Sequence, residues 1–209
     1  PVGQEEEIRD LVRQEIQPLC QKTWIDEAGN LIGYLQGQQS QSAPITRILT
    51  HLDEISLIIN KIEADGRIFV SPLGGINGYS FGQGPVEILV NSKVIPGVLS
   101  IGSMHTNDQE SLVWKIKPEG GNQALDIKKM YVLTGYDKSE LESQGVGVGS
   151  RVVLAKKRRN LIFLGSGLVG GYFMDNRALV AASCLILRQI KKEKIRLPGD
   201  TYWIFSVAE

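Results

Sequence analysis

The sequence predicts an α/β protein that carries an inserted, small all-β domain, and three features of the chain lead to this fold class. Helix-like apolar spacing alternates with short apolar strands before residue 67, which is typical of a sheet with flanking helices. Between residues 67 and 166 the chain carries short strand-like runs separated by Gly, Pro and Asn, as in a small barrel or sandwich. Helical spacing then returns. We therefore expect an α/β domain with a mixed sheet, built from residues 1–66 and 167–209, around a barrel-like domain at 67–166.

The outer segments provide the helices and strands of this α/β domain. Residues 5–20 place apolar side chains on one face at helical spacing and begin with three glutamates, which suit the positive end of a helix dipole. Residues 178–193 repeat the helical spacing and end in lysines, which suit the negative end. Short apolar strands are expected at 24–26, 31–34, 47–50, 55–59 and 201–207.

The inserted segment has several candidate strands and one candidate helix. The helix would begin near Ser139, because Ser139 and Glu142 match a capping box, and it would end at Gly145. Short strands separated by turn residues predict a barrel or a sandwich for the rest of the segment. The strand-like runs are 67–70, 86–90, 94–101, 112–117, 130–133, 151–156 and 160–164.

Charge and hydrophobicity exclude several classes of protein. The 209 residues include 23 Lys and Arg and 23 Asp and Glu, so the formal net charge is zero. A dedicated nucleic-acid or anionic-membrane binder normally has a basic excess, so we expect neither partner. Hydrophobic residues make up 42% and charged residues 22% of the chain, which is ordinary for a globular protein. No apolar run approaches the roughly 20 residues that span a bilayer.

The two cysteines indicate the cellular compartment. Cys20 and Cys184 cannot form a disulfide framework, and the chain has no Cys-x-x-Cys motif. Both lie in helix-like patterns, where buried free thiols are the ordinary state. Because free thiols persist in a reducing environment, we expect a cytoplasmic protein.

Three polar residues follow predicted strands or precede a helix, where α/β sheets collect functional side chains. His51 comes directly after an apolar strand, and Asp53 is placed to hold its second imidazole nitrogen. Asp175 precedes the last helix, and its two oxygens suit a carboxylate that bridges metal ions. Glu209 follows the last strand, where it is a candidate general base.

Each of these residues also has an ordinary structural interpretation. His51 can be a satisfied surface histidine, Asp175 a helix N-cap, and Glu209 simply the last residue of the sequence. One histidine and a few carboxylates also fall short of the three or more protein ligands that a metal site usually has. Spacing alone therefore leaves both interpretations open.

Six segments of the chain, in order, resemble motifs of the tetrahedral aminopeptidase family. Residues 50–55 read Thr-His-Leu-Asp-Glu-Ile where the family has Ala-His-Met-Asp-Glu-Ile, and residues 175–177 read Asp-Asn-Arg where the family has Asp, Asp or Asn, and Arg. The family contains di-metal glutamyl, leucyl or deblocking aminopeptidases, some of which are also described as cellulases. The six segments are 1–5, 25–32, 50–55, 72–76, 175–177 and 205–209.

The resemblance implies a metallopeptidase-type sheet and assigns roles residue by residue. His51 would bind one metal ion, Asp53 would orient His51, Asp175 would bridge two ions, and Glu209 would be the general base. The cofactors would be two divalent metal ions, Zn or Co. The peptide bond that joins Asp175 to Asn176 would be cis.

The resemblance also implies a reaction and partners. The protein would be a metallo-aminopeptidase that hydrolyses the N-terminal peptide bond of short peptides. The inserted β domain would mediate self-association into dimers, and the dimers would assemble into a dodecamer.

Two other functions stay open. The family has further metal ligands after its general base, and this sequence ends before them, so we expect a portion of a longer protein. Without those ligands, the chain would be an inactive homologue that serves as an assembly or peptide-binding scaffold. A glycan hydrolase would need two acidic side chains about 5–10 Å apart and no metal, whereas His51 and Asp175 favour a metal.

Overall fold

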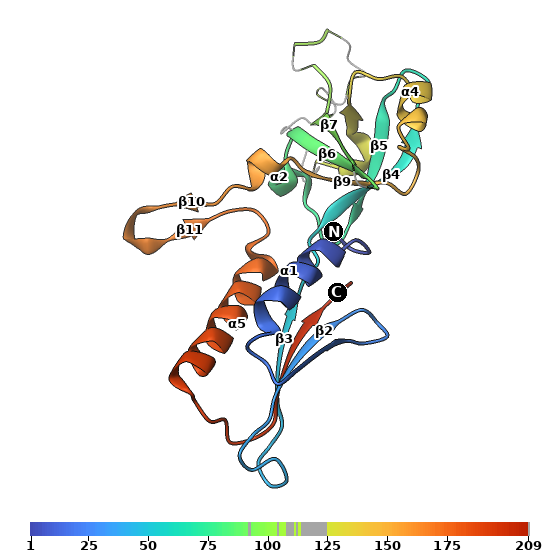
Figure 1. The fold of residues 1–209 in the computed structure, drawn as a ribbon. Helices are drawn as coiled ribbons and strands as arrows, with labels where there is room; N and C mark the ends of the chain where they lie inside the picture. Colours follow the sequence, from blue (N-terminus) through green and yellow to red (C-terminus); the bar gives the residue numbers. More distant parts are fainter. Residues whose placement is uncertain (92, 104, 108–110, 112, 114–124, 209) are drawn as a thin grey trace. The chain divides into compact units, whose positions relative to one another are not determined.

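The computed structural model describes residues 1–91, 93–103, 105–107, 111, 113 and 125–208, which form two compact units. The first unit contains residues 1–54 together with the segment that begins at Phe173, and the second contains residues 55–172 (Figure 1). The change from helical spacing to short strand-like runs predicts the two domain boundaries at residues 66 and 166 instead. The first boundary differs because strand β4 (Ser56–Ile62) pairs with strands of the second unit.

The first unit is built on a four-stranded mixed sheet, as the sequence predicts. The sheet order is β1-β2-β12-β3. Strand β12 runs antiparallel to β2 and parallel to β3, with Ser206 beside His51 in the register. The parallel pair therefore ends at the same edge of the sheet, where His51 lies. The four strands are β1 (Lys22–Ile25), β2 (Leu31–Leu35), β3 (Thr46–His51) and β12 (Thr201–Ser206).

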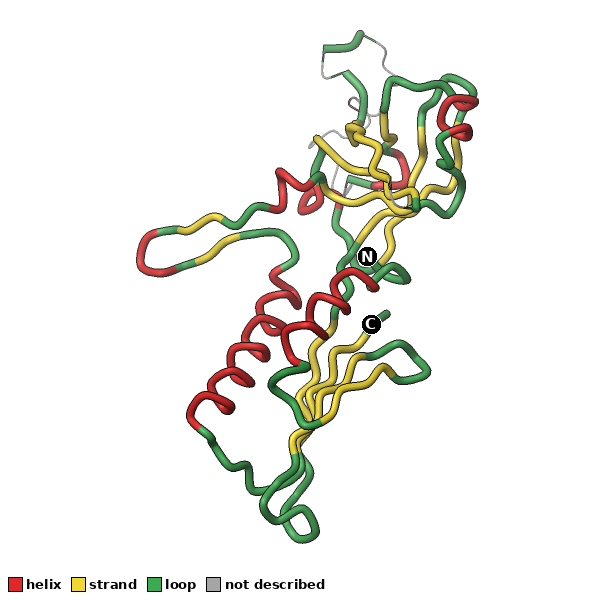
Figure 2. Tube along the Cα trace, in the orientation of Figure 1, coloured by secondary structure: helices red, strands yellow, loops and turns green. Residues whose placement is uncertain are grey.

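Helices α1 (Glu6–Ile16) and α5 (Met174–Glu193) pack on this sheet and on each other (Figure 2). The alternation of burial along β12 shows which face they cover, because Trp203 and Phe205 are buried while their neighbours are partly exposed. A strand with one buried face shows this period of two. The core consists of Val12, Ile16, Leu31, Leu52, Val180, Leu187, Trp203 and Phe205.

The second unit is a closed antiparallel barrel, which confirms the barrel-like insertion expected from the short strands. The strands close in the order β4-β5-β8-β7-β6-β9. The hairpin of β6 and β7 provides seven paired positions, from Gly84 with Leu99 to Val90 with Lys93. Besides β4, the strands are β5 (Ile68–Leu73), β6 (Gly84–Val90), β7 (Lys93–Ser100), β8 (Tyr131–Leu133) and β9 (Arg151–Leu154).

The predicted capping box of the inserted helix is wrong by two residues. Helix α4 spans Lys138–Ser143, and its N-cap is Asp137. The Asp137 carboxylate accepts from the Glu140 backbone N–H at 2.9 Å, and the Glu140 carboxylate accepts from the Asp137 N–H at 2.9 Å. An aspartate is at least as good an N-cap as a serine, so the acidic residue upstream of Ser139 determines where the helix begins.

Short elements complete the second unit. The predicted strand at 112–117 lies outside the described residues except for residue 113. Within the part of the chain that the structure describes, no helix combines the length and the apolar character needed to cross a membrane. The short elements are α2 (Gly78–Phe81), η1 (Ile127–Lys129), η2 (Lys156–Arg159), β10 (Ile162–Phe163), η3 (Gly165–Gly167) and β11 (Val169–Gly170).

Candidate active site

The candidate site lies where β3 and β12 end side by side. His51 is the last residue of β3, and the chain is held to β12 beyond that point because Leu52 N–H donates to the Ser206 carbonyl at 2.7 Å. The Ser206 hydroxyl donates in return to the Thr50 carbonyl at 3.4 Å. Side chains that leave the sheet here are therefore carried on backbone that is fixed on both strands. Rigid supporting backbone is what a functional site requires.

The His51 ring is oriented by the residue two positions further on. Its Nδ1 lies 3.2 Å from the backbone carbonyl oxygen of Asp53 and 3.6 Å from the nearer Asp53 carboxylate oxygen. A carbonyl oxygen can only accept, so this contact favours the tautomer that carries its proton on Nδ1. The Asp53 side chain, at 8% relative exposure, contributes a nearby negative charge. The proton on Nδ1 leaves Nε2 as the nitrogen that can bind a ligand.

Asp175 meets the other side of the imidazole. Its Oδ1 lies 3.0 Å from His51 Nε2, although 124 positions separate the two residues in the sequence. The backbone of Asp175 (φ −86°, ψ 106°) and of Asn176 is not helical, and among the described residues the Asp175 carboxylate bonds His51 and caps no backbone N–H of α5. The peptide bond between Asp175 and Asn176 is cis, as the resemblance implies. The structure thus brings together His51, Asp53 and Asp175.

A second ion pair supports this arrangement and was not foreseen from the sequence. The Arg177 guanidinium lies 3.3 Å from the Glu54 carboxylate, whose side chain is only 6% exposed. Glu54 follows Asp53 in the chain, and Arg177 follows Asp175 by two positions. Glu54 and Arg177 each lie in a segment that resembles a family motif, so the sequence does draw attention to both residues. The sequence does not show that they form a pair, because only the fold brings their opposite charges together.

A turn between β1 and β2 holds the segment that leaves β12. The Asn30 side-chain oxygen accepts from the Val207 N–H at 3.0 Å, and the Asn30 amide nitrogen donates to Asp26 at 2.9 Å. The hydrogen bond from Asn30 is the largest cause of the lowered pKa of Asp26. Glu209, the predicted general base, comes two positions after Val207 and lies outside the described residues.

The side chains at this site are of types that bind metal ions, but there are fewer of them than a metal site usually has. His51 Nε2 and Asp175 Oδ1 are two electron-pair donors that face each other at 3.0 Å, an arrangement that a shared cation or proton stabilises. One imidazole nitrogen and one carboxylate suit borderline divalent ions such as Zn or Co. Among the described residues, no group of three or more His, Cys, Asp or Glu side chains is placed to hold a metal ion.

Comparisons with known proteins identify the family of the chain. A family model for M42 glutamyl aminopeptidases matches residues 29–209. The lysyl aminopeptidase of Pyrococcus furiosus is 25% identical over 203 residues, which cover 97% of this chain and 53% of the relative. The solved structure of aminopeptidase APDkam598 from the archaeon Desulfurococcus kamchatkensis is 26% identical with a TM-score of 0.82, and it covers 100% of this chain and 52% of that one.

More distant structures share the fold. The TET1 peptidase of Pyrococcus horikoshii is 21% identical with a TM-score of 0.75, and the match covers 99% of this chain and 56% of that one. The chain spans about half the length of the curated relatives it matches. The predicted metallopeptidase fold is confirmed by these structures. Because the family model matches most of its length, the chain belongs to the M42 glutamyl aminopeptidase family.

Proposed function

We propose that the protein containing this chain is a di-metal aminopeptidase that removes the N-terminal residue of short peptides. The observation that carries the proposal is the contact of His51 with Asp175 at the end of two parallel strands, in a chain of the M42 family. Relatives named as aminopeptidases support the reaction. The substrates and the metal dependence are inferences for the whole protein.

Four residues would share the chemistry. His51 and Asp175 would hold the metal ions, with Asp175 as the bridging carboxylate. The Asp53 carbonyl oxygen keeps the proton on His51 Nδ1, so Nε2 presents its lone pair. Two bound divalent ions would lower the pKa of a water molecule toward about 7 and polarise the scissile carbonyl. The Glu209 carboxylate would accept the proton of that water and return it to the leaving amine.

The assembly and location of the protein follow from the same argument. We infer self-association through the barrel of residues 55–172, since the P. horikoshii TET1 peptidase, a structure of similar fold, can assemble into a tetrahedron or a large octahedral shell. Two free cysteines, both partly buried, are consistent with a reducing cytoplasm. The balanced net charge gives no overall basic excess of the kind that nucleic-acid binders normally have.

The two other functions have less support. An inactive scaffold would not need His51 and Asp175 to converge, and no observation favours that role. A glycan hydrolase would need a pair of acidic residues that flank the bond to be cleaved, whereas the described site pairs an acid with a histidine.

A chelation experiment on the full-length protein tests the proposal. Hydrolysis of leucyl-, glutamyl- and lysyl-p-nitroanilide is measured before and after EDTA, and again after addition of Zn or Co. We expect EDTA to abolish hydrolysis and one of the metals to restore it. The variant His51→Ala should stay inactive after metal addition, while His105→Ala, which removes the only other histidine, should behave as the wild type. Activity that persists in EDTA would contradict the proposal.

A further inference from the structure

A cavity of about 620 Å³ opens at the other end of the same unit. It lies where β2 ends, and Leu35 at that end pairs with Thr201, the first residue of β12. The candidate active site lies at the opposite end of β12, where Ser206 pairs with His51. Five residue steps along a strand separate the two ends, which corresponds to about 17 Å. The cavity is therefore distinct from the site that holds His51.

The base of the cavity is apolar. Leu19 and Leu35 come from the ends of the α1 region and β2, and Ile190 and Leu197 come from the last turn of α5 and the loop after it. Cys20 adds a thiol whose pKa is raised to about 11 by burial. At neutral pH the thiol is uncharged and behaves as a small apolar group. These side chains would accept an aliphatic chain and offer no nucleophile.

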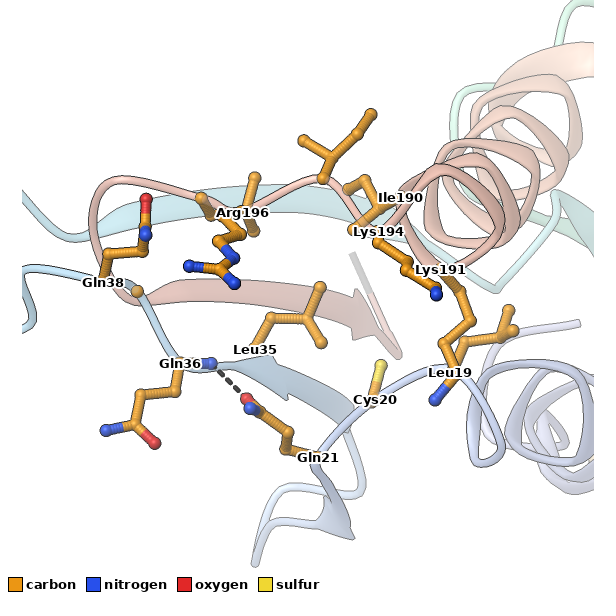
Figure 3. Close-up of a pocket in the computed structure, with 13 residues that line it drawn as sticks. Leu19, Cys20, Gln21, Leu35, Gln36, Gln38, Ile190, Lys191, Lys194 and Arg196 are labelled. Atoms are coloured by element: carbon orange, nitrogen blue, oxygen red, sulfur yellow. Dashed lines mark hydrogen bonds between the residues drawn. The ribbon is translucent and has the colours of Figure 1, made fainter.

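Three cations line the same cavity. Lys191 and Lys194 come from the end of α5, and Arg196 comes from the loop beyond it. Figure 3 shows the side chains of Lys194 and Arg196 extending toward the strand that carries Leu35, with their charged heads apart from one another. In the part of the chain that the structure describes, none of the three belongs to an ion pair within 4.0 Å.

Two acidic residues lie near these cations in the sequence, and neither of them lines the cavity. The Glu193 carboxylate, which lies between the lysines in sequence, accepts from the Gln189 side chain. The Asp200 carboxylate accepts from the Gly37 backbone N–H at 2.9 Å. The cavity therefore presents a positive rim over an apolar base, and this charge distribution complements an anion that carries an apolar chain.

Helix termination alone does not explain all of these cations. Lysines in a last helical turn stabilise the negative end of a helix dipole, which accounts for Lys191 and Lys192. Lys194 sits in the left-handed region, with φ of 53°, at a position after the helix where glycine is usual. Arg196 lies two residues further on, outside the helix. Arg196 is therefore placed at the cavity without being part of the helix end, whereas Lys194, the C-cap of α5, lies both at the helix end and at the cavity.

We propose that this cavity binds a carboxylate joined to an aliphatic chain. Its volume falls within the roughly 300–1,000 Å³ range of small-molecule sites. The carboxylate would lie between Lys194 and Arg196, and the chain would lie on Leu19, Leu35 and Ile190. A fatty acid and the C-terminal leucine of a peptide share this chemistry, so the experiment includes one probe for each.

Calorimetry on the full-length protein tests the proposal with octanoate and with N-acetyl-leucyl-leucine, which has no free N-terminus to be hydrolysed. Octanol and the C-terminal amide of the dipeptide are the uncharged controls, and acetate is the control without a chain. We expect saturable binding of at least one carboxylate, and the tighter of the two identifies the source. Equal binding of the uncharged controls or of acetate, or binding of neither carboxylate, would overturn the proposal.

Variants of the cations that line the cavity distinguish specific binding in the cavity from a general attraction of anions to a basic surface. Lys194→Gly fits the left-handed backbone, and Arg196→Gln changes a loop residue, so both variants are expected to fold. Each should weaken carboxylate binding about ten-fold, because a charge-assisted hydrogen bond is lost. Lys192→Gln is the matched control, since Lys192 lies at the same helix end but does not line the cavity. Equal weakening by the control, or none by the two rim variants, would overturn the proposal.

Discussion

The Arg177 guanidinium lies 3.3 Å from the carboxylate of Glu54, and this ion pair connects the two segments that carry the candidate site. One segment brings Asp53 beside His51, and the other brings Asp175 to the far side of the same ring. Glu54 is nearly inaccessible, with 6% relative exposure, so its charge is poorly solvated. A charge in that position depends strongly on its protein partners.

Replacement of Arg177 by glutamine should therefore destabilise the protein. We expect a loss of about 1–3 kcal/mol in the free energy of unfolding, because Glu54 loses a charged partner in a poorly solvated place. Urea unfolding followed by circular dichroism measures the loss. Arg188→Gln is the matched control, since its pair with Glu15 is exposed and should contribute less than about 1 kcal/mol. Equal losses for both variants would contradict the role given to the Glu54 pair.

Replacement of the turn residue Asn30 should lower both the stability of the fold and the turnover of the full-length protein. Asn30→Ala removes the acceptor for the Val207 N–H and the donor to Asp26, and we expect a cost of about 1–2 kcal/mol in stability. In the full-length protein, kcat should fall at least ten-fold, since the segment leading to Glu209 is no longer held. Steady-state kinetics and thermal unfolding are compared with Asn60→Ala, which removes an exposed hydrogen bond to Ser71 in the barrel. Unchanged kcat in Asn30→Ala would count against the positioning role.

The same turn should contribute to the pH dependence of stability. The pKa of Asp26 is lowered in the fold, first by the Asn30 side chain and then by backbone N–H groups. The stabilisation is therefore fully present above the unfolded-state pKa of about 3.9 and is lost as the pH falls through the lower folded-state pKa. Asp26→Asn should be less stable than the wild type at pH 7, and the difference should shrink below about pH 3.9. Urea unfolding measured at pH 7 and at several pH values below about 3.9 would disprove the account if the difference stayed constant.

Close backbone packing near the loop after α5 gives a prediction about stability alone. A Cβ atom added to Gly199 would lie 2.2 Å from the Pro44 carbonyl oxygen, which forces the backbone apart. We expect Gly199→Ala to cost about 1–3 kcal/mol. Gly147→Ala is the control, because a Cβ there meets no atom within 4 Å. A thermal shift for Gly199→Ala no larger than that of the control would show that the loop can adjust.

Much of the fold could be predicted because it depends on local patterns. The continuous run of apolar residues at 202–205 predicts a strand, and the structure has β12 there, although its burial alternates in a way that the run itself does not indicate. The domain boundary could not be predicted in the same way. Apolar residues at 56–62 look alike in a sheet and in a barrel, and only pairing with β5 and β9 assigns them to the barrel. The helix cap was misplaced because two capping candidates lie two residues apart and Asp137 takes the position.

The candidate site could be predicted only in part. His51 and Asp175 were identified from their places after a strand and before a helix, and the structure brings them within 3.0 Å. The pair of Glu54 with Arg177 spans 123 positions and has no periodic pattern that points to it. The same limitation applies to Asn30 and Val207, whose contact depends on how two strands pair.

Metal content tests the central claim most directly. The full-length protein is purified without chelators, and zinc and cobalt are quantified per chain by plasma mass spectrometry in the wild type and in three variants. We predict about two ions per chain in the wild type and in His105→Ala, and a clear loss in His51→Ala and Asp175→Ala, because these replacements remove the proposed ligands. Circular dichroism confirms that each variant is folded. Equal metal content in all four proteins would contradict a metal centre at His51 and Asp175.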